Sequence, residues 1–356
     1  MINNKNIIMN NSNNRFFNSL YLMKVIACFA VIVIHSCIFN IDSINGEWWA
    51  LNLFNSFSRF AVPMFIMISG ALLINDKYSL SYFLKKRAAR IIPPLIFWSV
   101  IYLIWLGDSR LLSLNVIKTI IAGPVYYHLW YLYSMIGVLL FSPIISAAYL
   151  NSTKETKTYF LVMWAIIYSL YPVARQFFDM QFDLLNVYEL YSFFGLIGWY
   201  FLGAFLRDHI TGKNETQKST TPLFIFIASS LSIAILTYLY SSGMNVITKD
   251  VGITSPLFFE RNSPLIIIST VSLFIYLSNI RLNPEGKTFK LTKIISSFSL
   301  GIYCLHLMIL RELLDPITNL FQNRWLSVPA LAITVSILCF VIIYPLRKIK
   351  ITKYIL

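Results

Sequence analysis

A lysine and a histidine stand eleven residues apart in the apolar segment LYLMKVIACFAVIVIHSCIF, as Lys24 and His35. Eleven helical steps of about 100° end about 20° past three full turns, so both side chains lie on one helix face, about 16 Å apart along the axis. Titratable side chains are costly in hydrocarbon, which makes an intramembrane histidine a candidate functional residue. The plainer alternative is a lysine that snorkels to the interface and a histidine that bonds a neighbouring helix.

A second candidate is the basic cluster in NDKYSLSYFLKKRAARIIPP, which holds five cations between Lys77 and Arg90. Arg87 and Arg90 are three residues apart, so on a helix they are neighbours. The cluster can set membrane topology and contact lipid headgroups. It can also clamp a polyphosphate, because arginine forks match phosphate oxygens bidentately. The pair Pro93-Pro94 predicts a break just inside the following span.

Three of the four histidines fall toward one side of the predicted membrane region. His128 lies in YYHLWYLYSM and His306 in SLGIYCLHLMIL, at depths similar to that of His35. An aromatic belt explains the tyrosines and Trp130 at this level, but it explains His128 less well. His209 falls in a predicted cytoplasmic loop and is expected to be solvated.

Arg59 is a further cation within a predicted span, and a charge there needs a partner. Glu189 and Asp183, near the outer end of a later span, are the predicted partners.

The composition predicts an all-α, polytopic integral membrane protein. The 356 residues are 57% hydrophobic and only 12% charged, against about 25% charged in soluble domains, and the mean hydropathy is +0.68. Segments of this kind fit a hydrocarbon core of about 30 Å. The ten predicted spans are approximately 17–39, 54–74, 91–106, 126–149, 158–172, 189–206, 222–240, 263–280, 294–312 and 327–345.

The charges predict that both termini are cytoplasmic. With that topology 20 of the 29 Lys and Arg residues lie on the cytoplasmic side and 7 in the outer loops, a positive-inside distribution. The net charge of +14 is thereby explained without nucleic acid as a partner. The same topology places His35 toward the outside and the Arg87–Arg90 pair toward the cytoplasm.

Three segments are expected: a disordered cytoplasmic tail over 1–15, a transmembrane domain over 16–346 and a basic cytoplasmic tail over 347–356. The first fourteen residues contain seven Asn and no cleavage signal. The cysteines lack metal-ligand spacing and are expected to be small buried hydrophobes, with no metal site. They are Cys28, Cys37, Cys304 and Cys339.

Five motifs, in this order, resemble those of the acyltransferase family 3 membrane proteins, which transfer acyl groups onto cell-surface glycans. They are the basic-x10-His first helix, SRFAVPMFIMISGALL, RAAR before Pro-Pro, YHLWYLY and SLGIYCLH. In detail they most resemble the branch that contains the O-acetyltransferase of enterobacterial common antigen. The resemblance implies the bacterial cytoplasmic membrane, acetyl-CoA as co-substrate with no permanently bound cofactor, and a surface polysaccharide or its lipid-linked precursor as acceptor.

The resemblance also implies roles for individual residues. His35 matches the essential histidine, which would act as general base or as transient acyl carrier. Lys24, Arg87 and Arg90 match the donor-binding positions. The candidates for orienting the acceptor or stabilising an oxyanion are Arg59, His128, Trp130 and His306.

The chain departs from the family pattern at two positions. Lys24 stands where the family usually has Arg, and Tyr21 where it often has Asp. Lysine keeps the charge but lacks the bidentate fork, and Tyr21 removes the expected carboxylate partner. Some members carry a further extracytoplasmic esterase-like domain; this protein is expected to lack such a domain and to complete the transfer alone.

Two other classes of membrane protein are alternatives to an acyltransferase. A transporter or flippase of a lipid-linked glycan predicts charged residues along a continuous path, whereas intramembrane acids are scarce here and the histidines gather on one side. A glycan polymerase or ligase usually has a large basic outer loop, which no predicted loop matches. For an acyltransferase, a donor other than acetyl-CoA, such as succinyl-CoA, remains an alternative.

Overall fold

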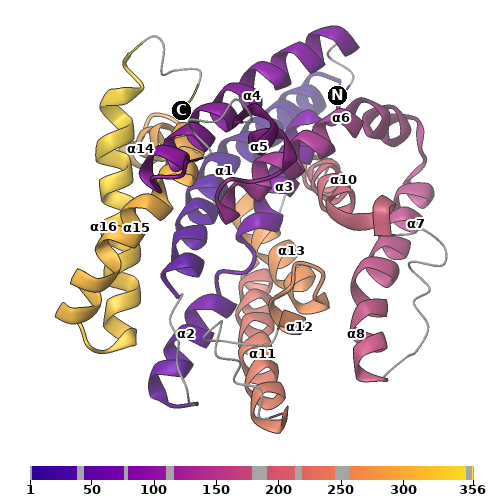
Figure 1. Ribbon diagram of the computed structural model, residues 1–356. Helices are drawn as coiled ribbons and strands as arrows, with labels where there is room; N and C mark the ends of the chain where they lie inside the picture. The colour runs from indigo at the N-terminus through magenta and orange to yellow at the C-terminus, as the bar shows by residue number, and fades with distance from the viewer. Residues whose placement is uncertain are drawn as a thin grey trace.

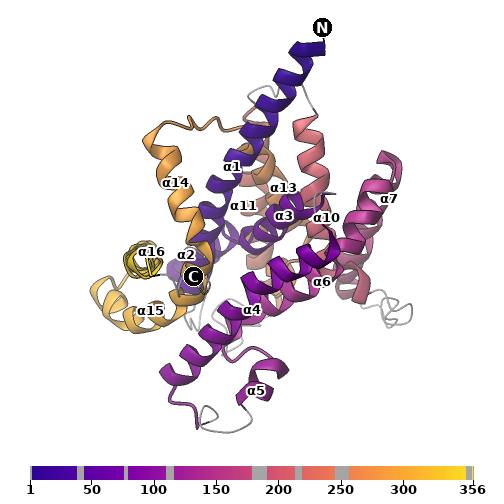
Figure 2. The same ribbon diagram turned by 90° about the horizontal axis from the view of Figure 1, so that it is seen from above.

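The computed structural model describes residues 2–37, 44–75, 79–109, 116–178, 191–212, 219–244, 256–349 and 355. All regular structure within these ranges is helical, as the composition predicts. Glu189 and Asp183, the predicted partners of Arg59, lie outside the described residues. The two views in Figures 1 and 2 show the helices gathered around α1, and α16 is seen end-on in Figure 2.

The first half of the chain supplies the core of the bundle and one flank. Its elements are α1 (Ile2–Ser36), α2 (Gly46–Ser56), α3 (Ala61–Leu73), α4 (Leu80–Trp105), α5 (Val116–Ala122), the 3₁₀ turn η2 (Tyr127–Leu129), α6 (Trp130–Asn151), α7 (Lys154–Trp164), the π-helical turn η3 (Ala165–Leu170) and α8 (Tyr171–Phe177). The second half supplies α10 (Tyr191–Thr211), α11 (Thr221–Met244), α12 (Pro256–Phe259), α13 (Pro264–Ser278), α14 (Lys287–Ser297), α15 (Ser299–Leu320) and α16 (Arg324–Leu346).

Helix α1 lies at the centre and contacts α3, α10, α13, α14, α15 and α16. It begins at Ile2 and runs without interruption to Ser36. A helix extends in this way because each residue added to an already helical span gains one backbone hydrogen bond without a new nucleus.

Seven helices among the described residues are long and apolar enough to cross a membrane. The pair α14–α15, bent by 68° at Phe298, would be an eighth span. The predicted spans 158–172 and 189–206 fall outside this group. The first consists of three short helices joined end to end, and the second is kinked at Gly195, so neither offers one long regular helix.

Helices α3 and α10 pack very closely because both carry glycine at the contact. A Cβ atom at Gly70 would overlap the backbone carbonyl of Tyr200, and one at Gly203 would overlap that of Met67. Small residues at such positions let two membrane helices approach backbone to backbone. The contact fixes α3 against α10 behind the site described below.

The break predicted at Pro93-Pro94 is absent, since α4 is one helix from Leu80 to Trp105 with both prolines inside it. Proline removes a donor from the helix, but neighbouring groups in a membrane bundle can satisfy the freed carbonyls. As a result Arg87 and Arg90 share one continuous helix with Tyr102, which donates its hydroxyl to the Cys304 carbonyl of α15 at 2.9 Å.

The surface of the bundle is apolar on the outer helices, as expected for side chains that face lipid. On α6 and α16 the exposed side chains include Leu140, Phe141, Ile144, Ile333, Ile337 and Val341. The four cysteines are buried and unpaired, which agrees with their predicted role as small hydrophobes.

Candidate active site

A cavity of about 190 Å³ lies between α1, α3, α4, α6 and α15. Three cations line it: Lys24 on α1 and the Arg87–Arg90 pair on α4. Tyr131 and Tyr303 line it as well, and between these polar groups the wall is apolar. The apolar lining includes Val31, Phe65, Ile68, Leu132 and Met135.

The cations of the cavity lie close enough to repel one another. Lys24 and Arg90 interact unfavourably, and so do Arg90 and Arg347 at the end of α16. Burial, with a further contribution from the charge of Arg90, lowers the pKa of Arg347. Arg87 packs over the ring of Phe83 at 5.5 Å. Several positive charges held this near each other form a site that an anion would stabilise.

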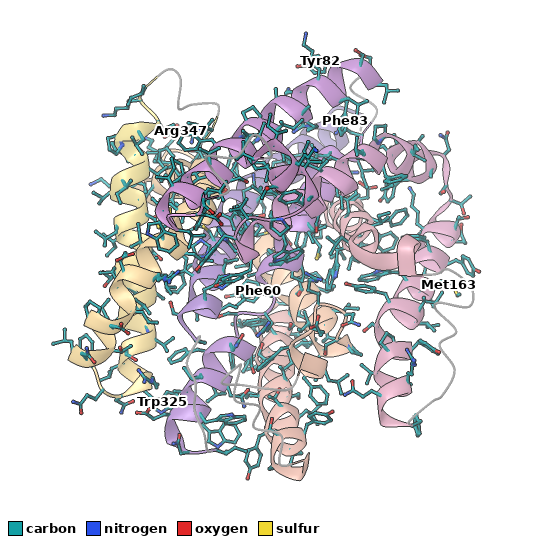
Figure 3. All side chains as sticks on the ribbon, in the orientation of Figure 1. Phe60, Tyr82, Phe83, Met163, Trp325 and Arg347 are labelled. Atoms are coloured by element: carbon teal, nitrogen blue, oxygen red, sulfur yellow. The ribbon has the colours of Figure 1, made fainter. Side chains whose placement is uncertain are left out.

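Arg347 was not singled out by sequence, where it was counted only as part of the basic tail. Its guanidinium donates to the carbonyl and hydroxyl oxygens of Ser297, both at 2.5 Å, and it packs over Phe298 at the α14–α15 break. Figure 3 shows Arg347 at the same end of the molecule as Tyr82 and Phe83, and Trp325 at the opposite end. The basic side of the bundle is thus assembled from α1, α4 and α16.

The three predicted histidines meet although they come from three separate elements. The ring centroids of His35 on α1 and His306 on α15 are 5.2 Å apart. His128 in η2 lies 5.4 Å from His306. His128 and His306 are 1% and 0% exposed, so both are shielded from bulk solvent. Within the described residues no three His, Cys, Asp or Glu side chains are arranged to hold a metal ion.

Two further tyrosines connect the histidines with their surroundings. The hydroxyl of Tyr127 lies 3.4 Å from Nδ1 of His35, and the Tyr127 side chain is 50% exposed. Tyr303 donates its hydroxyl to the backbone carbonyl of His128. Tyr303 also lines the cavity, and its ring centroid lies 5.4 Å from that of His128 and 5.9 Å from that of His306, so this residue borders both the cation-lined space and two of the histidines.

The sequence pattern assigns Tyr127 and Tyr131 to an aromatic belt and does not single out Tyr303. A signal for one of them existed: Tyr303 stands three residues before His306 in SLGIYCLH, one helical turn away on the same face.

Arg59 and Trp130 occupy the neighbourhood of the histidines without joining their ring contacts. Arg59 donates to the carbonyl of Phe259 at 3.3 Å, packs over that ring at 4.4 Å and interacts electrostatically with His35. The ring of Trp130 faces the guanidinium of Arg261 at 4.2 Å. The charge of Arg59 is also balanced in part by Glu260, the residue after Phe259.

The structure therefore groups the sequence candidates into two neighbouring clusters. Lys24, Arg87 and Arg90 share the cavity, and the histidines pack together beyond Tyr303. His35 is not among the cavity-lining residues, but Val31, one turn before it on α1, is. The cavity thus follows the Lys24-to-His35 face of α1 for most of its length.

Comparison with known proteins supplies the family. No curated protein and no solved structure gave a significant match to the chain. The family model for acyltransferase 3, described as an acyltransferase domain, matches residues 17–344 and thus nearly the whole chain. With apolar helices able to span a membrane and a cation-lined cavity that reaches Tyr303 beside the histidines, this protein belongs to the acyltransferase 3 family of membrane acyltransferases.

Proposed function

We propose that the protein is an O-acetyltransferase of the bacterial cytoplasmic membrane. It takes an acetyl group from cytoplasmic acetyl-CoA and transfers it to a hydroxyl of a surface polysaccharide or of its lipid-linked precursor. The observation that carries the proposal is the cavity that begins at Lys24, Arg87 and Arg90 and reaches Tyr303, whose ring contacts His128 and His306.

The basic end of the cavity suits the nucleotide end of acetyl-CoA, which is highly anionic. Arg87 and Arg90 supply planar forks for phosphate oxygens, and Lys24 supplies a point charge. Repulsion between Lys24 and Arg90 is relieved when an anion lies between them. The apolar wall toward Val31 and Met135 suits the uncharged pantetheine arm and the thioester.

His35 is the proposed general base. It takes the proton of the sugar hydroxyl while the hydroxyl oxygen attacks the thioester carbonyl carbon. The tetrahedral intermediate then loses the CoA thiolate, which receives the proton from His35 and leaves as the free thiol. His128, Trp130 and Arg59 are the candidates to orient the sugar or to stabilise the oxyanion, and both His128 and Arg59 interact electrostatically with His35.

The base role and the acyl-carrier role of His35 differ in one intermediate. A carrier forms an acetyl-imidazole bond before the sugar binds, whereas a base does not. Rapid quench with radiolabelled acetyl-CoA in the absence of an acceptor decides between them, because only the carrier retains label on the protein. We favour the base because Nδ1 of His35 is directed at the half-exposed Tyr127, the side from which a sugar would arrive.

The proposed function is tested on the product. Surface polysaccharide from cells with the wild-type protein is expected to show O-acetyl signals in NMR that disappear from cells without it. His35→Ala should remove the same signals, and His209→Ala, at an exposed position on α10, should keep them. Normal acetylation by His35→Ala would rule out both roles of His35. Succinyl-CoA supplied to purified protein in place of acetyl-CoA tests the identity of the acyl group.

A further inference from the structure

A backbone hydrogen bond fixes the tautomer of His306. Its Nδ1 lies 2.5 Å from the carbonyl oxygen of Tyr303, three residues earlier on α15. A carbonyl oxygen can only accept, so Nδ1 of His306 must carry the proton and donate it. In the neutral ring the second nitrogen, Nε2, then holds a lone pair and acts only as an acceptor.

That second nitrogen is buried, and within the described part of the chain it has no hydrogen-bond partner. A buried acceptor without a partner is unfavourable, which suggests that a donor reaches it at another stage of the reaction. A neutral His306 cannot donate a hydrogen bond from Nε2 to an oxyanion. The lone pair on Nε2 can only accept, so it requires an N–H or O–H donor nearby.

The imidazole of His35 is placed to supply that donor. Its ring centroid is 5.2 Å from that of His306, a separation at which imidazole edges can come within hydrogen-bond distance after a small rotation. Catalytic hydrogen bonds are often long before substrate binds and shorten afterwards. The other nitrogen of His35, Nδ1, faces the hydroxyl of Tyr127 at 3.4 Å, which shows that an O–H group can approach it from the half-exposed side.

We propose that His306 is a positioning residue that holds His35 in its Nε2–H tautomer, so that Nδ1 is the nitrogen that takes the proton of the acceptor hydroxyl. The backbone of Tyr303 orients His306, His306 orients His35, and His35 meets the substrate. This inference rests on the proposed function, because it assigns which nitrogen of His35 acts as the base.

In this arrangement the N–H of His35 donates to Nε2 of His306 throughout the transfer. When the sugar hydroxyl gives its proton to Nδ1, His35 becomes an imidazolium whose Nε2–H is already bonded to a buried acceptor. No proton passes to His306, whose Nδ1 proton stays on the Tyr303 carbonyl. The proton on Nδ1 of His35 then moves to the departing CoA thiolate.

The first test measures tautomers directly and needs no acyl transfer. Protein with ¹⁵N-labelled histidine is purified in nanodiscs, where only four histidines give imidazole signals. His35→Gln and His209→Gln variants assign the spectrum by loss of a signal. We expect His35 protonated at Nε2 and His306 protonated at Nδ1, and we expect His306→Asn to change the His35 tautomer. A wild-type His35 protonated at Nδ1, or a His35 signal that is unchanged in His306→Asn, would overturn the proposal.

The second test compares two substitutions that mimic different nitrogens of His306. The amide of His306→Asn occupies the place of Nδ1 and keeps the bond to Tyr303, whereas the longer His306→Gln brings an acceptor oxygen near the place of Nε2. With acetyl-CoA and water as the probe pair, kcat for thiol release is expected to fall about 10²-fold or more in His306→Asn and about tenfold in His306→Gln, with KM nearly unchanged in both. Equal losses in the two variants would contradict a positioning role through Nε2. The proposed function is judged separately by the O-acetyl signals of the surface polysaccharide, and the tautomer measurement judges the His35–His306 pair whether or not the protein releases thiol with water as acceptor.

Discussion

The hydroxyl of Tyr303 donates to the backbone carbonyl of His128 and so ties α15 to the 3₁₀ turn η2. Both groups are buried, and the ring of Tyr303 packs against the imidazole of His128 at 5.4 Å. The bond joins two segments from distant parts of the sequence at the point where the cavity meets the histidines.

Tyr303→Phe is therefore expected to impair the site more than the fold. The substitution removes one donor from this buried carbonyl of His128, which also accepts from the backbone N–H of Trp130, and the loss of one hydrogen bond costs about 0.5–1.5 kcal/mol. We expect a lower unfolding temperature and at least a tenfold fall in kcat, with the KM for acetyl-CoA close to that of the wild type. Tyr159→Phe, which removes a hydroxyl from an exposed position on α7, serves as the control. A Tyr303→Phe enzyme with normal turnover would show that the bond does not hold His128 for catalysis.

The cavity cations should set donor affinity. Arg87→Gln and Arg90→Gln each remove a charged fork, and each is expected to raise the KM for acetyl-CoA about 10–100-fold with a smaller effect on kcat. Lys86→Gln, on the same helix at an exposed position outside the cavity lining, should change KM little. If the three variants behave alike in steady-state kinetics, the basic cluster serves topology and lipid contacts instead.

Arg347 gives a prediction that the sequence did not suggest. Arg347→Gln loses two hydrogen bonds to Ser297 and one charge from the cation group, so both the α14–α15 break and the donor site should loosen. Binding of acetyl-CoA measured by calorimetry is expected to weaken about tenfold at low salt, and the difference should shrink at high salt because screening removes long-range charge effects. The neighbouring Lys348→Gln is the matched control. Equal affinities of Arg347→Gln and Lys348→Gln for acetyl-CoA at low salt would show that Arg347 does not contribute to donor binding.

The contact of α3 with α10 can be tested by adding one methyl group. Gly70→Ala places a Cβ against the Tyr200 carbonyl, and overpacking of this kind costs about 1–3 kcal/mol. Gly137→Ala on α6 meets no atom within 4 Å and should leave stability unchanged or slightly raised. Thermal unfolding in detergent, followed by loss of the monodisperse peak in size-exclusion chromatography, compares the two. Equal unfolding temperatures would mean that the helices separate here at little cost.

The sequence by itself determined the kind of protein and most of the chemistry-bearing side chains. Apolar segments of span length dictate membrane helices, because unsatisfied backbone groups are too costly in hydrocarbon for other structures. Lys24, Arg87 and Arg90 match the donor-binding positions of the motifs, and the three residues line one cavity. The sequence motifs also predicted the acyltransferase 3 family, and the family model that matches residues 17–344 confirms it.

Local patterns were less reliable where the surroundings of a residue decide the outcome. The break expected at Pro93-Pro94 is absent from α4, which runs as one helix from Leu80 to Trp105. Local propensity predicts a preference, whereas neighbouring helices and an already formed span decide whether the helix continues.

Only the tertiary structure decided how the site is assembled. His35, His128 and His306 come from segments spread over most of the chain, and no periodicity within one segment could say that their rings meet. The tautomer of His306 depends on a carbonyl one turn away, and the place of Arg347 depends on where α16 ends beside α14. Helix periodicity determines which residues share one face of a helix. Which other helix packs against that face depends on the packing of all helices together, and this is a property of the whole fold.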